Sequence, residues 1–156
     1  MNPDTIEGIT SVITGLVSAM GLVATVEVED IPHRGTVFSI HPESSAYMLI
    51  GHRGEHLHAL EVLVVAMSHR VLPETAWFSL DVDDYKRKRE WYLKETVQGA
   101  VEHLEQTGKQ GGLVPMPSYE RRFVHSYIQE RYPQVESESV GVAQSRRIVL
   151  KKKSKE

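Results

Sequence analysis

Two glycines that flank a basic pair are the first residues whose types and spacing could do chemistry. Gly51 and Gly54 enclose His52 and Arg53. Glycine adopts positive φ and has no Cβ, so the backbone of another molecule can lie against such a turn. A helix that begins at Gly54 would offer unpaired N–H groups to a phosphate, and Arg53 would add a charged donor. The turn is therefore a candidate phosphate-binding site, with a merely helix-breaking turn as the alternative.

Apolar residues on both sides of the turn extend this hypothesis to unpaired bases. We expect four of them to floor a groove beside the turn: Leu49, Ile50, Leu57 and Leu60. A GxxG turn between two helices with such a groove is how a KH domain clamps a single strand. The acidic residues Glu43, Glu55 and Glu61 count against this interpretation, because they would repel phosphate at long range.

A second group of residues combines arginine and histidine at helical spacing. In the segment 118–131, Arg121, Arg122, His125 and Gln129 fall within about 100° of one another on a helix, and the apolar residues occupy the opposite side. Guanidinium groups bind phosphate and stack on bases, and imidazole can stack or donate. The face is a second candidate nucleic-acid contact, and a solvated face with Arg–Glu pairs is the alternative. We expect Ser118 to be the N-cap of this helix. Glu120 lies in the first turn, where the positive end of the helix dipole favours a negative charge.

The remaining polar groups do not form a catalytic or metal-binding pattern. His52, His56 and His58 lack a carboxylate or a third imidazole with metal-ligand geometry, so we expect no metal site here and interpret His56 and His58 as helix-surface residues. The chain has no cysteine, which excludes thiolate ligands and nucleophiles. His125 has no nucleophile or carboxylate at motif spacing. The sequence therefore predicts no enzyme, no metal and no cofactor.

Four consecutive cations, Lys86 to Arg89, form a third basic segment. Four successive residues cover the whole circumference of a helix, so at least one of these side chains must lie along the core. We expect the others to be solvated and to be partly neutralised by Asp81, Asp83 and Asp84.

Periodicity and turn residues predict the elements that position these groups. We expect a helix over 6–20 ended by Gly21, strands over 22–28 and 36–41 joined by a turn over 31–35, helices over 43–50 and 55–71, and a strand over 77–82. A long helix over 84–106, a loop over 107–118, the helix over 118–131 and strands over 135–139 and 146–150 follow. In the 55–71 helix the apolar side is Leu57, Leu60, Val64, Met67 and Val71. This order predicts an α+β fold.

Charge divides the 156 residues in the same way. Residues 1–80 hold three Arg and no Lys against nine Asp and Glu, a net charge of −6, whereas residues 81–156 hold fifteen Lys and Arg against twelve Asp and Glu, a net charge of +3. The basic half favours a polyanionic partner. The uncharged stretch 8–26 has acidic flanks, which favours an amphipathic helix and a strand over a signal peptide or a membrane span.

Several of these blocks, in this order, resemble the bacterial Jag family (SpoIIIJ-associated, KhpB or EloR proteins), which joins a KH-like domain to an R-3-H domain named after its Arg-x-x-x-His signature. The resemblance runs from Leu22 to Leu150. It is carried by Leu49–Gly54 with Leu57 and Leu60, by Leu80–Val82 with Tyr85, by Tyr119–His125, and by Ser139, Gly141 and Arg146–Leu150. It implies a type II KH-like domain (α-β-β-α-α-β) over 1–82 and an R-3-H domain over 83–156.

The resemblance implies a cytoplasmic, non-catalytic protein that binds single-stranded RNA, without stable membrane insertion. The nucleic-acid contacts it implies are Gly51, His52, Arg53, Gly54, Arg121, Arg122 and His125. It also implies post-transcriptional regulation linked to cell elongation or division, and a small single-KH protein or a second copy as partner. Two alternatives remain: the acidic KH half serves only as a protein-interaction scaffold, or the R-3-H domain binds single-stranded DNA.

The sequence also departs from the family pattern. His52 stands where the family usually has a fixed cation, which predicts a weaker and pH-sensitive clamp. Ser118 replaces a frequent proline, and the loop over 142–145 replaces a stretch that is usually acidic. We expect the N-terminal Jag domain that is common in the family to be missing.

Overall fold

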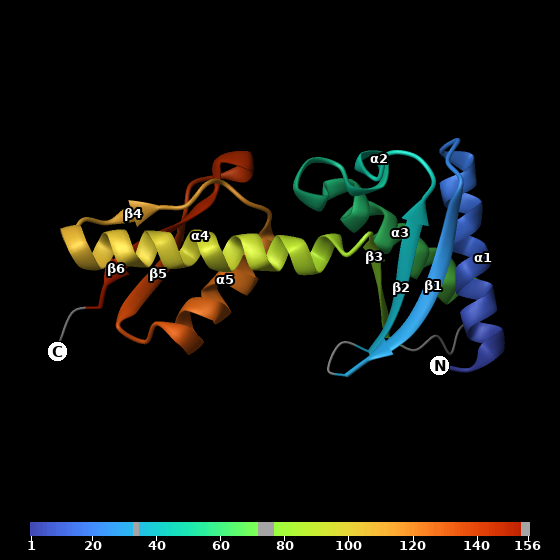
Figure 1. Cartoon of the computed structure of the whole chain (residues 1–156), viewed down its shortest axis with the longest axis horizontal. Helices are drawn as coiled ribbons and strands as arrows, with labels where there is room; N and C mark the ends of the chain where they lie inside the picture. Colours follow the sequence, from blue (N-terminus) through green and yellow to red (C-terminus); the bar gives the residue numbers. More distant parts are fainter. Residues whose placement is uncertain (33–34, 72–76, 154–156) are drawn as a thin grey trace. The chain divides into compact units, whose positions relative to one another are not determined.

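The computed structural model describes residues 1–32, 35–71 and 77–153 of the chain. It divides into two compact units, Met1–Arg87 and Lys88–Glu156 (Figure 1). Helices and strands occur in both units, so the predicted α+β class is confirmed.

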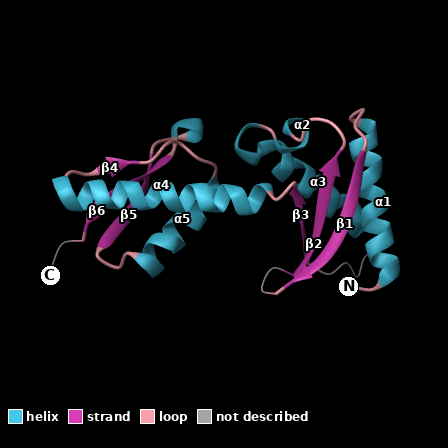
Figure 2. Cartoon of the chain, viewed as in Figure 1, coloured by secondary structure: helices cyan, strands magenta, loops and turns pink. Residues whose placement is uncertain are grey.

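In the first unit the elements follow in the predicted order. They are α1 (Pro3–Ala19), β1 (Ala24–Ile31), β2 (Gly35–Pro42), α2 (Tyr47–Ile50), a 3-10 turn (His52–Gly54), α3 (Glu55–Val71) and β3 (Phe78–Val82). β2 is the central strand: it pairs antiparallel with β1 and parallel with β3 (Figure 2). Of the turn predicted between β1 and β2, His33 and Arg34 lie outside the described residues.

The core of this unit lies between the sheet and the pair α1 and α3. Helical spacing buries Ile9, Ile13 and Val17 on α1, and strand alternation buries Phe38 and Ile40 on β2. α3 contributes the predicted Leu57, Leu60 and Val64. Met67 was predicted on the same side, but it is 41% exposed, so that prediction is wrong. α1 ends at Ala19 with Met20 as its C-cap, and Gly21 follows with φ 77°, as a glycine after a helix end often does.

The predicted helix over 43–50 is shorter in the structure, because α2 has only four residues. The Glu43 N–H donates to the Val23 carbonyl at 2.9 Å, which continues the β1–β2 ladder beyond the strand ends. The Ser45 hydroxyl accepts from the Tyr47 N–H at 3.4 Å. Glu43 therefore extends the β1–β2 hairpin, residues 43–46 do not form the first turn of a helix, and α2 begins only at Tyr47.

The second unit consists of two helices and a small sheet. Its elements are α4 (Tyr85–Thr107), which starts in the first unit, β4 (Gly111–Gly112), α5 (Ser118–Arg131), β5 (Val135–Val140), a 3-10 turn (Ala143–Ser145) and β6 (Arg147–Lys152). β6 is central and antiparallel to both β4 and β5. The sequence predicted a plain loop in place of β4, which is too short and too rich in glycine to show a strand pattern.

Two helices and β6 close the core of the second unit. α4 buries Leu93, Val97, Val101 and Leu104, one residue per turn along a single stripe. α5 buries Val124 and Ile128, and β6 buries Ile148 and Leu150. The opposite face of α5 is therefore left for polar side chains.

The helices that the structure describes, which lie within residues 1–32, 35–71 and 77–153, bear on membrane insertion. None of those helices combines the length and the apolar composition that a bilayer span requires.

Candidate nucleic-acid interface

The Gly51–Gly54 turn adopts a backbone that its two glycines make possible. Gly51 has φ 70° and ψ −174°, a region that residues with a Cβ avoid, and its N–H donates to the Tyr47 carbonyl at 2.8 Å. Gly54 has φ 81°, and Arg53 between them is also left-handed at φ 54°. The turn ends where α3 begins, at Glu55. The glycines therefore fix the direction of the chain between α2 and α3.

The imidazole of His56 fills the space beside Gly51. A Cβ at Gly51 would lie 2.4 Å from Cγ of His56, closer than atoms can approach. Nδ1 of His56 lies 2.9 Å from the Met48 carbonyl oxygen, which can only accept, so Nδ1 donates. Gly51 thus makes room for a contact inside the chain, which supports a structural role for this glycine.

The accessible chemistry of the turn comes from its two basic residues. Gly51 and Gly54 are buried, His52 is exposed and Arg53 is half-buried. The predicted groove floor is wrong for three of its four residues, because Leu49, Leu57 and Leu60 are at most 6% exposed and belong to the core. Helical spacing turns these side chains to the inner sides of α2 and α3. The fourth, Ile50, is half-buried beside the turn.

One of the acidic residues expected to oppose phosphate binding is occupied elsewhere. Glu61 accepts from the Leu80 N–H at 2.9 Å and from the Lys86 ammonium at 2.8 Å. Glu61 therefore accepts a hydrogen bond from a backbone N–H of β3, and its charge is neutralised by Lys86. Glu43 and Glu55 are exposed and retain their long-range effect.

α5 carries the second group of candidate residues, and its predicted bounds are confirmed. The N-cap, however, is Pro117 with ψ 162°, and Ser118 is the first helical residue, so the predicted Ser118 cap is wrong. Pro117 cannot offer a side-chain acceptor, and its carbonyl instead accepts from the Arg121 N–H at 3.0 Å. The extended backbone of proline starts the helix without a capping side chain.

Glu120 has a role that the sequence did not reveal. It is 1% exposed and accepts two hydrogen bonds from the Arg89 guanidinium, at 2.7 and 3.0 Å. Arg89 is the expected member of the basic run that lies along the core, and its guanidinium also stacks 5.1 Å from the Tyr92 ring centroid. This ion pair joins α4 to α5 and fixes how α5 is rotated about its own axis. Glu120 directly precedes Arg121, so the pair also fixes the direction in which Arg121 leaves the helix.

Arg121 and His125 lie on one face of α5, as predicted, and each is held by a hydrogen bond. Nη1 of Arg121 donates to the Met116 carbonyl at 2.7 Å. Nδ1 of His125 lies 2.8 Å from the Ser137 hydroxyl. Both side chains are half-buried, whereas Arg122 and Gln129 are exposed. Arg121 has further N–H donors and His125 has a second ring nitrogen, Nε2, beyond the bonds described, so these contacts orient both side chains without using all their polar atoms.

β5 and the segment before β6 complete this cluster. Ser137 and Ser139 are two residues apart on β5, so they share one face, and Ser139 accepts from Nε of Arg146 at 3.1 Å. The Arg146 carbonyl accepts from the Met116 N–H at 3.2 Å, which links it to the Arg121 contact. The sequence had marked Ser139 and Arg146 by resemblance but missed Ser137. Its only signal was the alternation of serine and glutamate over 136–139.

The protonation of His125 follows from its surroundings. Burial, and then the positive charge of Arg121, lower the pKa of His125 below 6.5. The ring is therefore neutral at pH 7 and serves as a hydrogen-bonding and stacking group. The fixed charge of the face comes from Arg121, Arg122 and Arg146.

The second unit matches a known domain family. Residues 92–152 match the family described as the R-3-H domain. The match lies wholly within the unit that contains Arg121 and His125. Among the described residues, no group of three His, Asp or Glu side chains is placed to hold a metal ion.

Three relatives carry the same printed name, RNA-binding protein KhpB. The chain is 30% identical to that of Lactiplantibacillus plantarum over 128 residues, which cover 81% of this chain and 39% of the relative. It is 30% identical to that of Bacillus subtilis over 109 residues, which cover 69% of this chain and 52% of the relative. It is 29% identical to that of Clostridium symbiosum over 82 residues, which cover 53% of this chain and 37% of the relative. The chain thus spans about half or less of the relatives it matches. The motifs, the domain match and these relatives agree: the chain is an R-3-H protein of the KhpB/Jag family.

Proposed function

We propose that this protein binds single-stranded RNA without catalysis, and that the α5–β5 face is its principal contact. The face is defined by Arg121, Arg122, His125, Ser137, Ser139 and Arg146. The relatives are named RNA-binding proteins, which supports nucleic acid as the ligand class. From the family resemblance we also propose a cytoplasmic role after transcription, in control of cell elongation or division.

The observation that carries the proposal is the cluster of prepositioned donors on this face. Hydrogen bonds to Met116, Ser137 and Ser139 orient Arg121, His125 and Arg146 before any ligand arrives. Arginine forks match phosphate geometry and stack on bases, and a neutral imidazole stacks and donates without repelling the arginines. Preorganisation of this kind lowers the entropy lost on binding.

The test is the binding of a fluorescein-labelled single-stranded RNA, followed by anisotropy at several salt concentrations. If four to six phosphates are neutralised, log affinity falls with log salt at a slope of about −3 to −4. A slope near zero would reject the electrostatic mechanism. A matched single-stranded DNA, used as competitor, measures the preference for RNA.

Arg122→Glu is the variant that addresses the face directly, because Arg122 is exposed and makes none of the holding contacts described above. We expect at least about a tenfold loss of affinity, since one phosphate contact is lost and a repulsive charge is added. Arg131→Glu makes the same charge change on the last turn of the same helix and is the control. Equal losses in both variants would reduce the effect to net charge and contradict the assignment.

The Gly51–Gly54 turn is proposed as a second, weaker contact of a KH-like domain over residues 1–82. Its exposed His52 and half-buried Arg53 could meet a phosphate, but the core position of Leu49 and Leu57 leaves few apolar partners for bases. Changing His52 and Arg53 together to aspartate should therefore weaken RNA binding less than Arg122→Glu does. A larger loss would make the turn the principal contact.

A specific observation favours the alternative in which the first unit is an interaction scaffold. The outer side of α3 carries an apolar stripe at helical spacing: Ala59, Val62, Leu63, Ala66 and Met67, all exposed. Val62 and Leu63 are more than half exposed. A stripe of this kind fits a second KH-like domain, either a small single-KH partner or another copy. If Leu63→Glu changes the sedimentation of the chain or its binding to such a partner while RNA affinity stays intact, both roles coexist on separate units.

A further inference from the structure

β1 is the outer strand of the first sheet, and one of its edges faces away from β2. In the sheet formed by the described residues the order is β1-β2-β3. The Val23 carbonyl accepts from the Glu43 N–H, and the register pairs Thr25 with His41 and Glu27 with Ser39. Backbone groups alternate along an antiparallel strand, so the N–H and C=O groups of Ala24, Val26 and Val28 point to the free edge. Such an edge can accept another strand.

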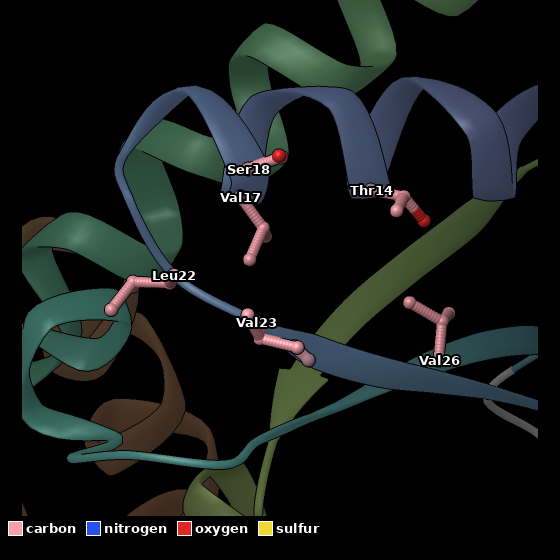
Figure 3. Close-up of a pocket in the computed structure, with 7 residues that line it drawn as sticks. Thr14, Val17, Ser18, Leu22, Val23 and Val26 are labelled. Atoms are coloured by element: carbon pink, nitrogen blue, oxygen red, sulfur yellow. The ribbon is translucent and has the colours of Figure 1, made fainter.

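A small apolar groove lies along this edge, between α1 and β1. It has a volume of about 120 Å³ and is lined by Thr14, Val17, Ser18, Leu22, Val23, Ala24 and Val26. In Figure 3, Thr14 and Val17 extend from α1 toward β1, and Val26 extends back toward α1. Of the three residues whose backbone groups point to the free edge, Ala24 and Val26 also line the groove. A residue paired with Val26 on an added strand would place its side chain on the same side, into the groove.

The other face of the same strand is acidic. Thr25, Glu27 and Glu29 are exposed there and alternate with the residues that border the groove. Glu27 lies 3.8 Å from the His41 ring, so part of this charge is engaged. On an added strand, the side chains between those entering the groove would lie beside Glu27 and Glu29. Opposite charges across strands stabilise a pair, and like charges destabilise it.

We propose that β1 binds an extended segment of a partner protein in which apolar residues alternate with Lys or Arg. The apolar residues occupy the groove, the basic residues meet Glu27 and Glu29, and backbone hydrogen bonds run along Ala24, Val26 and Val28. This mode gives affinity through the main chain and specificity through alternate side chains. A second copy of β1 is disfavoured, because it would bring glutamates opposite glutamates.

The probe is an acetylated and amidated peptide of alternating Val and Lys, eight residues long like β1, with a fluorescent label. Binding to the full chain is measured by anisotropy at low salt. The same peptide with Glu in place of Lys should bind at least about tenfold more weakly, because its charges repel. A Val–Lys peptide with a central Pro should also bind more weakly, because it lacks one N–H and cannot complete the ladder. Failure of the Val–Lys peptide to bind, or equal binding of the three peptides, overturns the proposal.

Two variants separate the groove from the charge. Ser18→Trp fills the groove from an exposed helix position and should lower affinity by about tenfold, whereas Ala19→Trp, exposed on α1 but outside the groove, should not. In the chain with Glu27→Lys and Glu29→Lys, the preference should invert in favour of the Val–Glu peptide. An unchanged preference overturns the charge assignment.

Sedimentation of the wild-type chain and of Ser18→Trp decides whether the edge is instead occupied by a second copy. A dimer that the substitution converts to a monomer would identify the occupant as another copy and overturn the peptide proposal. RNA binding is measured in parallel and should be unaffected by Ser18→Trp, so this test fails or succeeds independently of the RNA proposal.

Discussion

The two candidate contacts of this protein are held in place in different ways. In the first unit, the Gly51–Gly54 turn depends on backbone conformation: two glycines, a left-handed Arg53 and the ring of His56 packed against Gly51. In the second unit, the α5–β5 face depends on side chains: a buried Arg89–Glu120 pair and hydrogen bonds to Arg121, His125 and Arg146. Substitution of an exposed side chain should leave the conformation of the turn unchanged. Substitution of a side chain that holds the α5–β5 face should instead alter the orientation of its neighbours.

This difference has a consequence for binding. A turn fixed by its backbone presents only His52 and Arg53, and it lies in the acidic half of the chain. A face fixed by side chains presents three arginines and an imidazole in defined orientations. We therefore expect the second unit to carry the larger share of the proposed RNA affinity.

The largest effect is expected from Glu120→Ala. It leaves the Arg89 guanidinium without its carboxylate in a site where Arg89 is only 18% exposed. Removing one partner of a buried pair costs about 3–5 kcal/mol of the free energy of unfolding. Hydrogen exchange of peptides from residues 88–153 measures the loss where it occurs. Glu130→Ala, an exposed glutamate on the same helix, is the control, and similar losses in the two variants would contradict a buried structural pair.

Gly51→Ala should have the next largest effect, and in the other unit. The new Cβ would be strained at φ 70° and would meet the His56 ring, so we expect a loss of about 2–3 kcal/mol in the stability of the first unit. Gly15→Ala is the control, because a Cβ there meets nothing within 4 Å and stabilises a helix. Urea unfolding compares them. In the double variant with His56→Ala, part of the loss should be recovered; no recovery would show that the contact does not matter.

Ser137→Ala should have a smaller effect on stability and a visible one on RNA binding. It removes the hydroxyl beside Nδ1 of His125 and costs about 1 kcal/mol, with about a threefold loss of RNA affinity as the ring loses its orientation. Unfolding and anisotropy measure the two quantities. Ser126→Ala, on the exposed side of α5, should change neither. If RNA affinity is unchanged in Ser137→Ala, His125 does not need this contact.

The smallest effect is the dependence of stability on pH. The pKa of His125 is lowered in the folded state, so the contribution of the neutral ring is complete above about pH 6.5 and is lost as the pH falls toward the folded-state pKa. His125→Gln removes this titration, and unfolding from pH 7.5 to 5.5 should therefore show a shallower decline than in the wild type. His103→Gln, an exposed histidine on α4, serves as the control. An identical decline in His125→Gln and wild type would contradict the assignment.

Local periodicity was enough to predict most of the fold and the composition of one face. The bounds of α3 and α5 follow from apolar spacing, and the joint position of Arg121 and His125 follows from the helix period alone. The sequence could not predict contacts between distant segments. Glu120 was interpreted as a residue of the helix start because Arg89 is thirty-one positions away, and Ser137 was missed because β5 meets α5 only after folding.

The same limit explains the errors in the first unit. Leu49, Leu57 and Leu60 are apolar residues beside a turn, and sequence alone does not tell a groove floor from a core. In the second unit, Ser118 has the preferred chemistry of an N-cap, but Pro117 before it already has the extended backbone that a cap requires. β4 is two glycines long, and its pairing with β6 carries no pattern that a sequence could display.

The most direct test is a titration of the isotopically labelled full chain with single-stranded RNA, followed by amide chemical shifts. We expect the largest shifts along Arg121–Gln129 and at Ser137 and Ser139, smaller ones over Gly51–Glu55, and none along β1. Unchanged amide shifts in α5 and β5, with the largest changes at the glycine turn or elsewhere, would contradict the assignment of the α5–β5 face as the principal RNA contact.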